Sequence, residues 1–227
     1  MRRKRRSDHS IWSVGSLILA IILLIIIIVA FVRHIQARKT GSMHSEEQIL
    51  DEKYIEEWPD IDVQLLDVNE YSRPQIALDK VNGIVIHYTA NPGSTAQQNR
   101  DYFNGLAQSG ETYASSHFVI GLEGEIIQCI PCDEMAYASN DRNEDTIAIE
   151  CCIPDETGKF NGETYDSLVE LTAWLIGRYH LGIDDVIRHY DVTGKICPKY
   201  FVDHEDAWKR FKADVVAYID ENGEERK

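Results

Sequence analysis

The sequence predicts an α/β domain with a central mixed β-sheet flanked by helices, preceded by one transmembrane helix. Short runs rich in Ile and Val alternate with stretches of helical spacing, as in domains where strands and helices interleave. A long run near the N-terminus contains no charged residue. The 227 residues leave room for one domain of ordinary size beside that run.

The uncharged run covers residues 11–32, "IWSVGSLILAIILLIIIIVAFV". As a helix it would span about 33 Å, which is enough to cross the hydrocarbon core of a membrane. It is longer than the apolar region of a cleavable signal, so we expect an uncleaved anchor. Five basic residues precede the run and three follow it. This bias predicts a single-pass protein of the cell membrane, with residues 1–10 as a cytoplasmic basic tail and the domain outside the cytoplasm.

Residues 33–62 follow the predicted anchor. From Thr40 they read "TGSMHSEEQILDEKYIEEWPDID", which is acidic and has no clear periodicity. We interpret 33–62 as an acidic stalk that allows at most a short helix. The folded domain is expected to cover residues 63–222, with "VQLLDVNEYSRP" as its entry segment.

The net charge of −15 is unevenly distributed along the chain. Residues 1–39 hold eight basic residues and one acid, a net charge of +7, whereas residues 40–227 hold 15 basic residues and 37 acids, a net charge of −22. Such a domain repels phosphate at long range, so we exclude nucleic acid as a partner. The acidity is suited to keeping an extracytoplasmic domain soluble.

Three apolar segments predict strands. "GIVIHYT", residues 83–89, is a short β-branched run bounded by Gly83 and by "NPG". "SSHFVIGLEGEIIQCIP" reads as two strands joined by a tight turn at "LEG". "TIAIECCI", residues 146–153, is the next strand.

Three further segments predict helices. "STAQQNRDYFNGLAQ" begins with Ser94 and Thr95 as possible N-caps, each with a glutamine three residues later. "TYDSLVELTAWLIGRYHLG" has apolar residues at helical spacing, with Thr164 as a possible cap and Gly182 as a stop. An amphipathic helix over about 204–219 ends the domain.

Three residues in or beside the predicted sheet could hold a metal ion. His87 ends the first strand, His189 ends the short strand of "DVIRHY", and Cys197 follows eight residues after His189. A catalytic zinc site takes three such ligands and leaves the fourth position open. Each residue taken alone is also compatible with ordinary core packing, so the spacing by itself is a hypothesis.

Four segments resemble the zinc-dependent N-acetylmuramoyl-L-alanine amidases, which are relatives of the phage lysozyme-type amidases and the peptidoglycan recognition proteins. They are "GIVIHYTANPGSTAQQN", "SSHFVIGLEGEIIQCIP", "DTIAIECC" and "IRHYDVTGKICPKYF", and the similarity runs over about residues 65–220. The resemblance implies the amidase fold and one Zn²⁺ per domain, held by His87, His189 and Cys197. It also implies peptidoglycan or muropeptides as substrate, with hydrolysis of the amide between N-acetylmuramic acid and L-alanine.

The resemblance suggests two places for a general base. Some relatives have a tyrosine immediately before the position of His117, where this chain has Ser116, and Tyr113 lies three residues too early. Bacterial relatives have a glutamate in the later strand, and Glu150 matches it. A carboxylate among isoleucines is costly to bury without a polar partner, although the alternation would also suit a solvent-facing residue. We expect Glu150 to be the base.

The remaining site residues follow from the same resemblance. Lys195 matches a lysine of the family, and its ammonium is expected to stabilise the oxyanion formed when the amide carbonyl is attacked. Ser116 and Tyr88 are expected to contact the substrate. His117 points away from Ser116 along the strand, so we interpret it as structural.

The cysteines and the retained ligands bear on the alternatives. If Cys197 binds metal, four cysteines remain, and their pairing stays open: Cys129, Cys132, Cys151 and Cys152. "CIPC" closes a strand instead of opening a helix, which disfavours a thioredoxin-like site. The main alternative is a non-catalytic peptidoglycan-binding receptor of the same fold, and a weaker one is a zinc amidase acting on another amide. The presence of Cys197 argues against the receptor, since some binding-only relatives lack that ligand.

Overall fold

The computed structural model describes residues 9–226, with side chains described at 18–33, at 35 and from 46 onward. The chain divides into two compact units, Met1–Glu46 and Glu47–Lys227. The basic tail predicted at 1–10 and the first seven residues of the predicted anchor, 11–17, lie outside the residues whose side chains are described.

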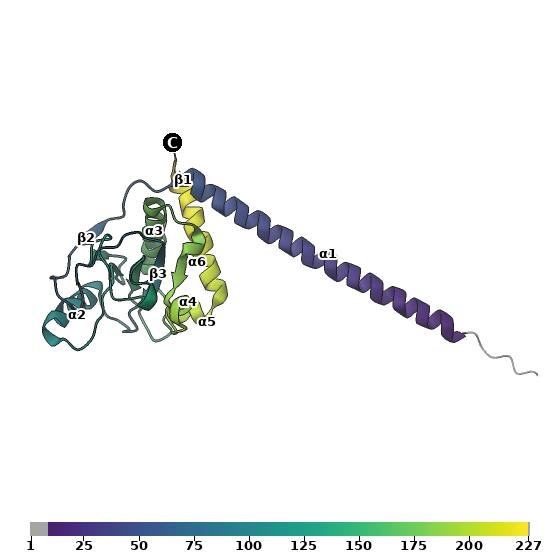
Figure 1. The fold of residues 1–227 in the computed structure, drawn as a ribbon, viewed down its shortest axis with the longest axis horizontal. Helices are drawn as coiled ribbons and strands as arrows, with labels where there is room; N and C mark the ends of the chain where they lie inside the picture. The colour runs from purple at the N-terminus through teal and green to yellow at the C-terminus, as the bar shows by residue number, and fades with distance from the viewer. Residues whose placement is uncertain (1–8, 227) are drawn as a thin grey trace, which may run out of the picture. The chain divides into compact units, whose positions relative to one another are not determined.

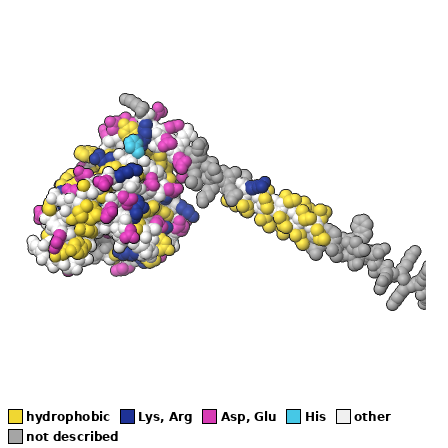
Figure 2. Space-filling view, viewed as in Figure 1, with side chains coloured by type: hydrophobic (Ala, Val, Ile, Leu, Met, Phe, Trp, Pro, Cys, Tyr) yellow, Lys and Arg dark blue, Asp and Glu magenta, His cyan; other side chains and the backbone are white. Residues whose placement is uncertain are grey.

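Helix α1 (His9–Glu52) runs through the first unit and ends in the second. Hydrophobic side chains cover its described part between residues 18 and 33 (Figure 2), and most of them are at least half exposed. Among the described residues, no helix is both long enough and apolar enough to qualify as a membrane span.

The second unit begins earlier than the sequence suggests. Residues 47–62, interpreted as the end of a stalk, lie within this unit. Leu50 and Ile55 are buried in its core. Strand β1 (Lys53–Tyr54) pairs with β8 (Glu224–Glu225) near the C-terminus. The acidic composition of 33–62 hides these buried apolar residues. The sequence allows a short helix there, and the structure has the end of α1, which continues to Glu52.

Six strands of the described chain form one mixed sheet in the order β2-β5-β4-β6-β3-β7. The strands are β2 (Ile61–Val63), β3 (Gly83–Tyr88), β4 (Phe118–Ile120), β5 (Ile126–Gln128), β6 (Thr146–Cys151) and β7 (Val186–Arg188). Only β4 and β5 pair antiparallel, as the predicted hairpin at "LEG"; the other neighbours are parallel. The predicted α/β class with a mixed sheet is confirmed.

The two faces of the sheet are covered differently. The isoleucines of β3 and β6 form the larger core with α3 (Gly162–Tyr179) and α6 (Glu205–Asn222), which lie side by side (Figure 1). Val119 and Ile127 pack on the opposite face with α2 (Ala96–Ser109). Because strand residues alternate between faces, His87 and Glu150 fall on the α2 side. The site is therefore built on the less thickly covered face.

The helix ends show which capping predictions hold. Thr95, and not Ser94, caps α2, and Gln98 completes the capping box. Asn161 caps α3 in place of Thr164, since its side-chain oxygen accepts the Thr164 N–H at 2.9 Å. His180, in a left-handed conformation, ends α3 two residues before Gly182.

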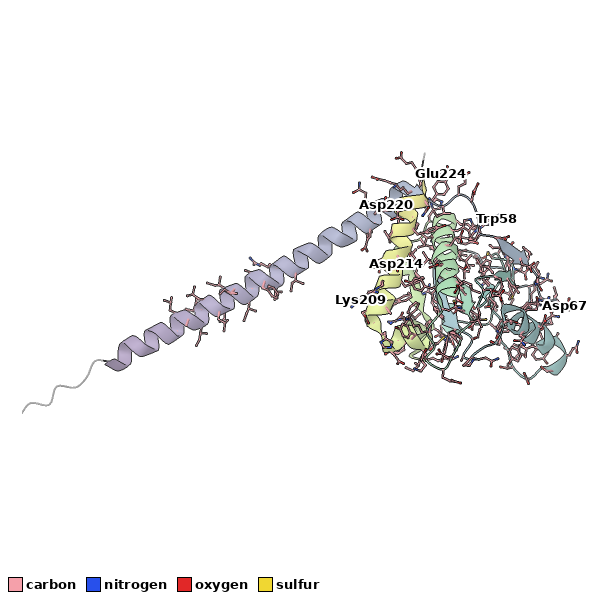
Figure 3. All side chains as sticks on the ribbon, turned by 180° about the vertical axis from the view of Figure 1, so that it is seen from behind. Trp58, Asp67, Lys209, Asp214, Asp220 and Glu224 are labelled. Carbon is pink, nitrogen blue, oxygen red and sulfur yellow. The ribbon has the colours of Figure 1, made fainter. Side chains whose placement is uncertain are left out.

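The last helix of the chain is longer than expected and is preceded by a short one. Helix α5 (Lys199–Asp203) leads into α6, where an expected helix over about 204–219 is found at 205–222. Lys209, Asp214 and Asp220 mark successive positions along α6 in Figure 3. Asp214 accepts a hydrogen bond from the Tyr165 hydroxyl of α3 at 2.6 Å, which joins the two helices over the larger core.

Candidate active site

Two parallel neighbours, β3 and β6, place His87 and Glu150 beside each other. The two residues are register partners in the central pair of the sheet. Both strands are buried along most of their length, so their backbones are held on both sides by other strands. The carboxyl ends of parallel strands are where functional side chains of α/β sheets emerge, and both residues lie there.

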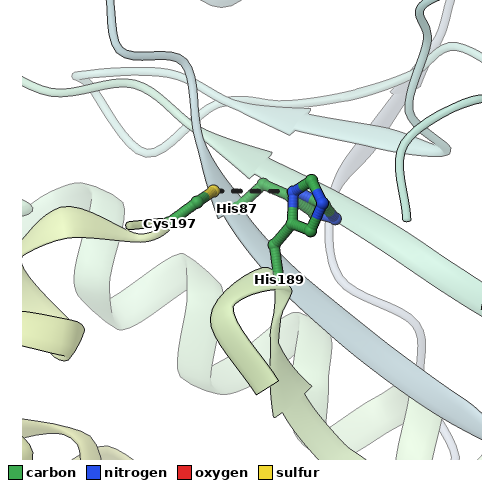
Figure 4. A group of neighbouring side chains, drawn as sticks. All are labelled: His87, His189 and Cys197. Atoms are coloured by element: carbon green, nitrogen blue, oxygen red, sulfur yellow. Dashed lines mark hydrogen bonds between the residues drawn. The ribbon is translucent and has the colours of Figure 1, made fainter. Parts of the chain in front are cut away.

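The segment after β7 contributes two further side chains that could bind a metal, His189 and Cys197. His189 is the first residue of the short helix α4 (His189–Thr193), directly after the edge strand β7. Gly194, at φ 79°, reverses the chain after α4, and the Tyr190 N–H binds the Cys197 carbonyl at 2.9 Å. This closed loop returns Cys197 to the end of β3 (Figure 4).

His87, His189 and Cys197, called the metal-donor group below, offer donor atoms that all lie within 4.8 Å of one another. The Cys197 sulfur is 3.8 Å from Nδ1 of His87 (Figure 4), and the two imidazole centroids are 4.8 Å apart. Nδ1 of His189 is buried and has no hydrogen-bond partner among the described residues. Two imidazoles and a thiol suit zinc, and a buried nitrogen with a free lone pair is what a metal ligand requires.

Burial is the main cause of the pKa shifts in the metal-donor group. It lowers the pKa of His87 well below its usual value, with the neighbouring His189 and Lys195 acting in the same direction. Burial also lowers the pKa of His189, again assisted by Lys195. Both imidazoles are therefore neutral at pH 7, which is the form that binds metals. Burial raises the pKa of the Cys197 thiol to about 12, and the Glu150 carboxylate adds to this effect.

Glu150 and Lys195 face the same cavity as the two histidines. Burial raises the pKa of the Glu150 carboxyl to about 7, and the Lys195 ammonium opposes this rise. One carboxyl oxygen of Glu150, Oε2, is buried without a hydrogen-bond partner among the described residues. A carboxyl that titrates near neutral pH beside a metal-donor group is suited to accept and return a proton.

The cavity has a volume of about 350 Å³. Besides His87, His189, Glu150 and Lys195 it is lined by residues of two loops and α2: Phe103, Tyr113, Ala114, Ser115, Tyr137, Ala138, Asn140 and Asn143. Tyr113 and Tyr137 form one wall, with ring centroids 5.4 Å apart. The cavity thus combines ionisable and metal-donor side chains with the two tyrosine rings.

The expectations for Ser116 and Tyr88 differ from what the structure contains. Ser116 is fully buried, and its hydroxyl donates to the Phe118 carbonyl at 2.9 Å, so it does not line the cavity. Ser115, one residue earlier, does. Tyr88 contacts the Cys197 sulfur through its backbone N–H, while its side chain packs against the larger core. Ser116 lies just before β4 and makes a structural hydrogen bond there, and its contact with substrate remains a prediction.

His117 is structural, as interpreted from the sequence. Its Nδ1 accepts the Ala148 N–H at 2.9 Å, and its Nε2 donates to the Glu134 carbonyl at 2.9 Å. With both nitrogens engaged and the ring fully buried, burial lowers its pKa to about 4. All five cysteines lie in the described part of the chain, and none of them forms a disulfide.

Sequence reasoning missed two residues that touch the metal-donor group. Ser139 Oγ lies 3.1 Å from Nε2 of His87, and Asn140 Oδ1 lies 2.9 Å from Nε2 of His189. They stand at the start of a 3₁₀ turn, η1 (Asn140–Arg142). The cluster "SND" indicates a turn, but nothing in it indicates which side chains the turn faces.

Comparison with known proteins agrees with this geometry. The sequence profile of the N-acetylmuramoyl-L-alanine amidase family Amidase_2 matches residues 77–200. The chain is 39% identical over 162 residues to the N-acetylmuramoyl-L-alanine amidase CwlL of Bacillus licheniformis, covering 65% of this chain and 44% of that protein. It is 33% identical over 171 residues to the amidase BlyA of Bacillus subtilis, covering 66% of this chain and 45% of that protein. The chain spans about half the length of these relatives.

A solved structure shares the fold. The catalytic domain of XlyA superposes with a TM-score of 0.58 at 26% identity, covering 69% of this chain and 99% of that domain. The range matched by the family profile, residues 77–200, includes His87, Glu150, His189 and Cys197. The chain belongs to the Amidase_2 family of N-acetylmuramoyl-L-alanine amidases.

Proposed function

We propose that this protein is a zinc amidase that hydrolyses the amide bond between N-acetylmuramic acid and L-alanine in peptidoglycan. The observation that carries the proposal is the metal-donor group, with its donor atoms within 4.8 Å, beside the unpaired carboxyl of Glu150. The family match and the names of the relatives give the bond and the substrate class.

His87, His189 and Cys197 would hold one zinc ion through two imidazole nitrogens and a thiolate. The ion, when bound, supplies Lewis-acid chemistry that activates water and polarises a carbonyl. The fit rests on the unpaired Nδ1 of His189 and on the neutral state of both imidazoles at pH 7. It also agrees with the donor set, which is one that zinc prefers.

Glu150 acts as the general base and then as the general acid. Its carboxylate accepts a proton from the attacking water and passes it to the amine of L-alanine as the amide C–N bond breaks. The Lys195 ammonium lies close enough to lower the pKa of Glu150, and it stabilises the negative charge that develops on the former carbonyl oxygen. Tyr113 and Tyr137 offer an aromatic surface for the substrate beside the reacting groups.

The same proposal places the enzyme at the cell membrane, with the domain outside the cytoplasm. Its support is the uncharged run at 11–32, the exposed apolar side chains of α1 and the excess of basic residues before the run. The net negative charge of residues 40–227 disfavours nucleic acid as a partner.

Release of stem peptide tests the reaction. The purified full chain in detergent, loaded with one equivalent of zinc, is expected to release free peptides with an N-terminal L-alanine from muropeptides, detected by mass spectrometry. Zinc-loaded protein that binds muropeptides without cleaving them would support the receptor instead. Cleavage of soluble peptide amides but not of muropeptides would support an amidase with another substrate.

A further inference from the structure

The loop between β5 and β6 contacts both histidines of the metal-donor group from the side away from Cys197. Nε2 of His87 lies 3.1 Å from Ser139 Oγ, and Nε2 of His189 lies 2.9 Å from Asn140 Oδ1. Nδ1 of His87 is 3.8 Å from the Cys197 sulfur, and Nδ1 of His189 is unpaired. Ser139 and Asn140, which are adjacent in the sequence, therefore each contact the Nε2 atom of one of the two imidazoles.

The Asn140 contact selects one tautomer of His189. An amide oxygen only accepts hydrogen bonds, so the proton of a neutral His189 must be on Nε2, and the lone pair of Nδ1 stays free. A serine hydroxyl can donate or accept. For His87, a metal at Nδ1 would put the ring proton on Nε2 and make Ser139 Oγ the acceptor.

The loop is held in place without help from the histidines. Asn143 Oδ1 accepts the N–H groups of Ala138 and Ser139 at 3.0 and 2.5 Å. The Asn143 N–H in turn binds the Asn140 carbonyl at 3.0 Å. Asn140 has a φ of 52°, in the left-handed region that asparagine tolerates better than most residues. The two contacts to the rings therefore come from a fixed support.

We propose that Ser139 and Asn140 are positioning residues of the metal site, which orient both imidazoles through Nε2 so that both Nδ1 atoms face the metal. The inference rests on the metal site of the proposed function, and it gives a role to two residues outside the metal-donor group. A hydrogen-bond partner on the ring nitrogen that does not bind the metal typically contributes about 10–100-fold to metal affinity.

Asn140 is the cleaner residue to change, because it is exposed whereas Ser139 is buried. Asn140→Gly removes the acceptor and keeps the left-handed φ accessible. Asn140→Asp keeps an acceptor oxygen at the same place. Asp141→Asn is the matched control, since Asp141 is exposed in the same turn and is not among the residues that line the cavity.

Zinc affinity of the full chain is measured by competition with a chromogenic chelator. We expect Asn140→Gly to raise the Kd for zinc about 10–100-fold and Asn140→Asp to keep it within about threefold of the parent. Asp141→Asn is expected to bind zinc like the parent. For Ser139, the matched pair is Ser139→Ala, which should weaken binding, and Ser139→Thr, which retains a hydroxyl.

A spectroscopic measurement on the zinc-free protein tests the orientation directly. Long-range ¹H–¹⁵N spectra distinguish the two imidazole tautomers. We expect His189 to carry its proton on Nε2 in the parent and in Asn140→Asp, and to populate both tautomers in Asn140→Gly. Thermal unfolding of the zinc-free proteins should be the same for all of the Asn140 and Asp141 variants, which separates positioning from a general loss of structure.

Three outcomes would overturn the inference. If the parent binds zinc and Asn140→Gly binds it equally well, the positioning role is wrong while the metal site stands. If Asn140→Asp is as weak as Asn140→Gly, the effect comes from the backbone and not from the acceptor oxygen. If the parent itself binds no stoichiometric zinc, the metal site of the proposed function fails, and the inference fails with it.

Discussion

At the scale of single residues, the proposed site separates the side chains that would hold a metal from the carboxyl that would move a proton. His87, His189 and Cys197 converge with their donor atoms, whereas Glu150 lies beside them with an unpaired carboxyl oxygen. Substitutions in the two sets should therefore have different consequences for zinc content and for turnover.

Glu150→Gln tests the proton transfer. The glutamine keeps the shape of the side chain but cannot accept a proton, so turnover should fall by ~10²–10⁴ while zinc content stays at one per chain. Glu144→Gln makes the same chemical change at an exposed position and should leave turnover unchanged. Near-normal turnover in Glu150→Gln would refute the base assignment.

Cys197→Ser tests the metal site. A neutral hydroxyl is a poor zinc ligand, so zinc content should fall below about a tenth of stoichiometric, and turnover should fall with it. The far-ultraviolet circular dichroism should stay unchanged, because the site lies at strand ends. Cys132→Ser, at a half-buried thiol outside the cavity, should keep its zinc. Full zinc content in Cys197→Ser would exclude the thiol as a ligand.

The sequence predicts these residues well where a motif fixes their neighbours. His189 and Cys197 belong to one short loop, and His87 and Glu150 end strands, so the topology of the sheet brings them together. Ser139 and Asn140 could not be predicted, because their contacts depend on the path of an irregular loop. Ser116 was predicted by analogy with a tyrosine of some relatives, and its side chain faces the interior.

At the scale of elements, the central strands are the most predictable part of the fold. The apolar runs at 83–89 and 146–153 become β3 and β6, and the turn at "LEG" becomes the β4–β5 hairpin. The short elements α4, α5 and η1 were not predicted, since three to five residues carry no measurable periodicity. Two of these elements contribute to the cavity, η1 through Asn140 and α4 through His189.

His117 joins β6 to the loop after β5, and this junction should depend on pH. Its pKa of about 4 in the folded state is below the unfolded value of 6.5, so between these values the unfolded chain binds a proton that the folded chain does not. The contribution of His117 to the free energy of unfolding is therefore fully present above pH 6.5 and is lost as the pH falls toward 4. The full shift corresponds to about 3 kcal/mol of unfolding free energy.

Denaturant unfolding of the zinc-free protein at pH values from about 4.5 to 7.5 measures how the free energy of unfolding depends on pH. His117→Gln does not titrate and should show a flatter dependence than the parent, whatever its absolute stability. The other histidines titrate in both proteins, so the difference between the two slopes reports His117. Equal slopes would show that the pKa of His117 is the same in the folded and unfolded states, which would contradict the expected shift.

At the scale of the whole molecule, the charge and apolar distributions predict where the chain resides. The first 39 residues carry a net charge of +7, and the remainder carries −22. If residues 11–32 anchor the chain, washing membranes with alkaline carbonate or with about 1 M salt, which screens surface charge, should leave the protein in the membrane pellet. Detergent should release it. Release by carbonate alone would indicate peripheral attachment.

A final consequence concerns the order in which the molecule can be completed during synthesis. His87 and Cys197 are 110 positions apart, and β3 lies between β6 and β7, which both come later in the chain. Two strands that are distant in the sequence cannot pair until both have been synthesised. Their pairing then closes a long loop of chain. A nascent chain that ends before residue 189 holds only His87 of the metal-donor group and lacks both His189 and Cys197. If the proposed zinc site is required for hydrolysis, a chain that ends before residue 189 is inactive, and the activity appears only after both late donors have been synthesised.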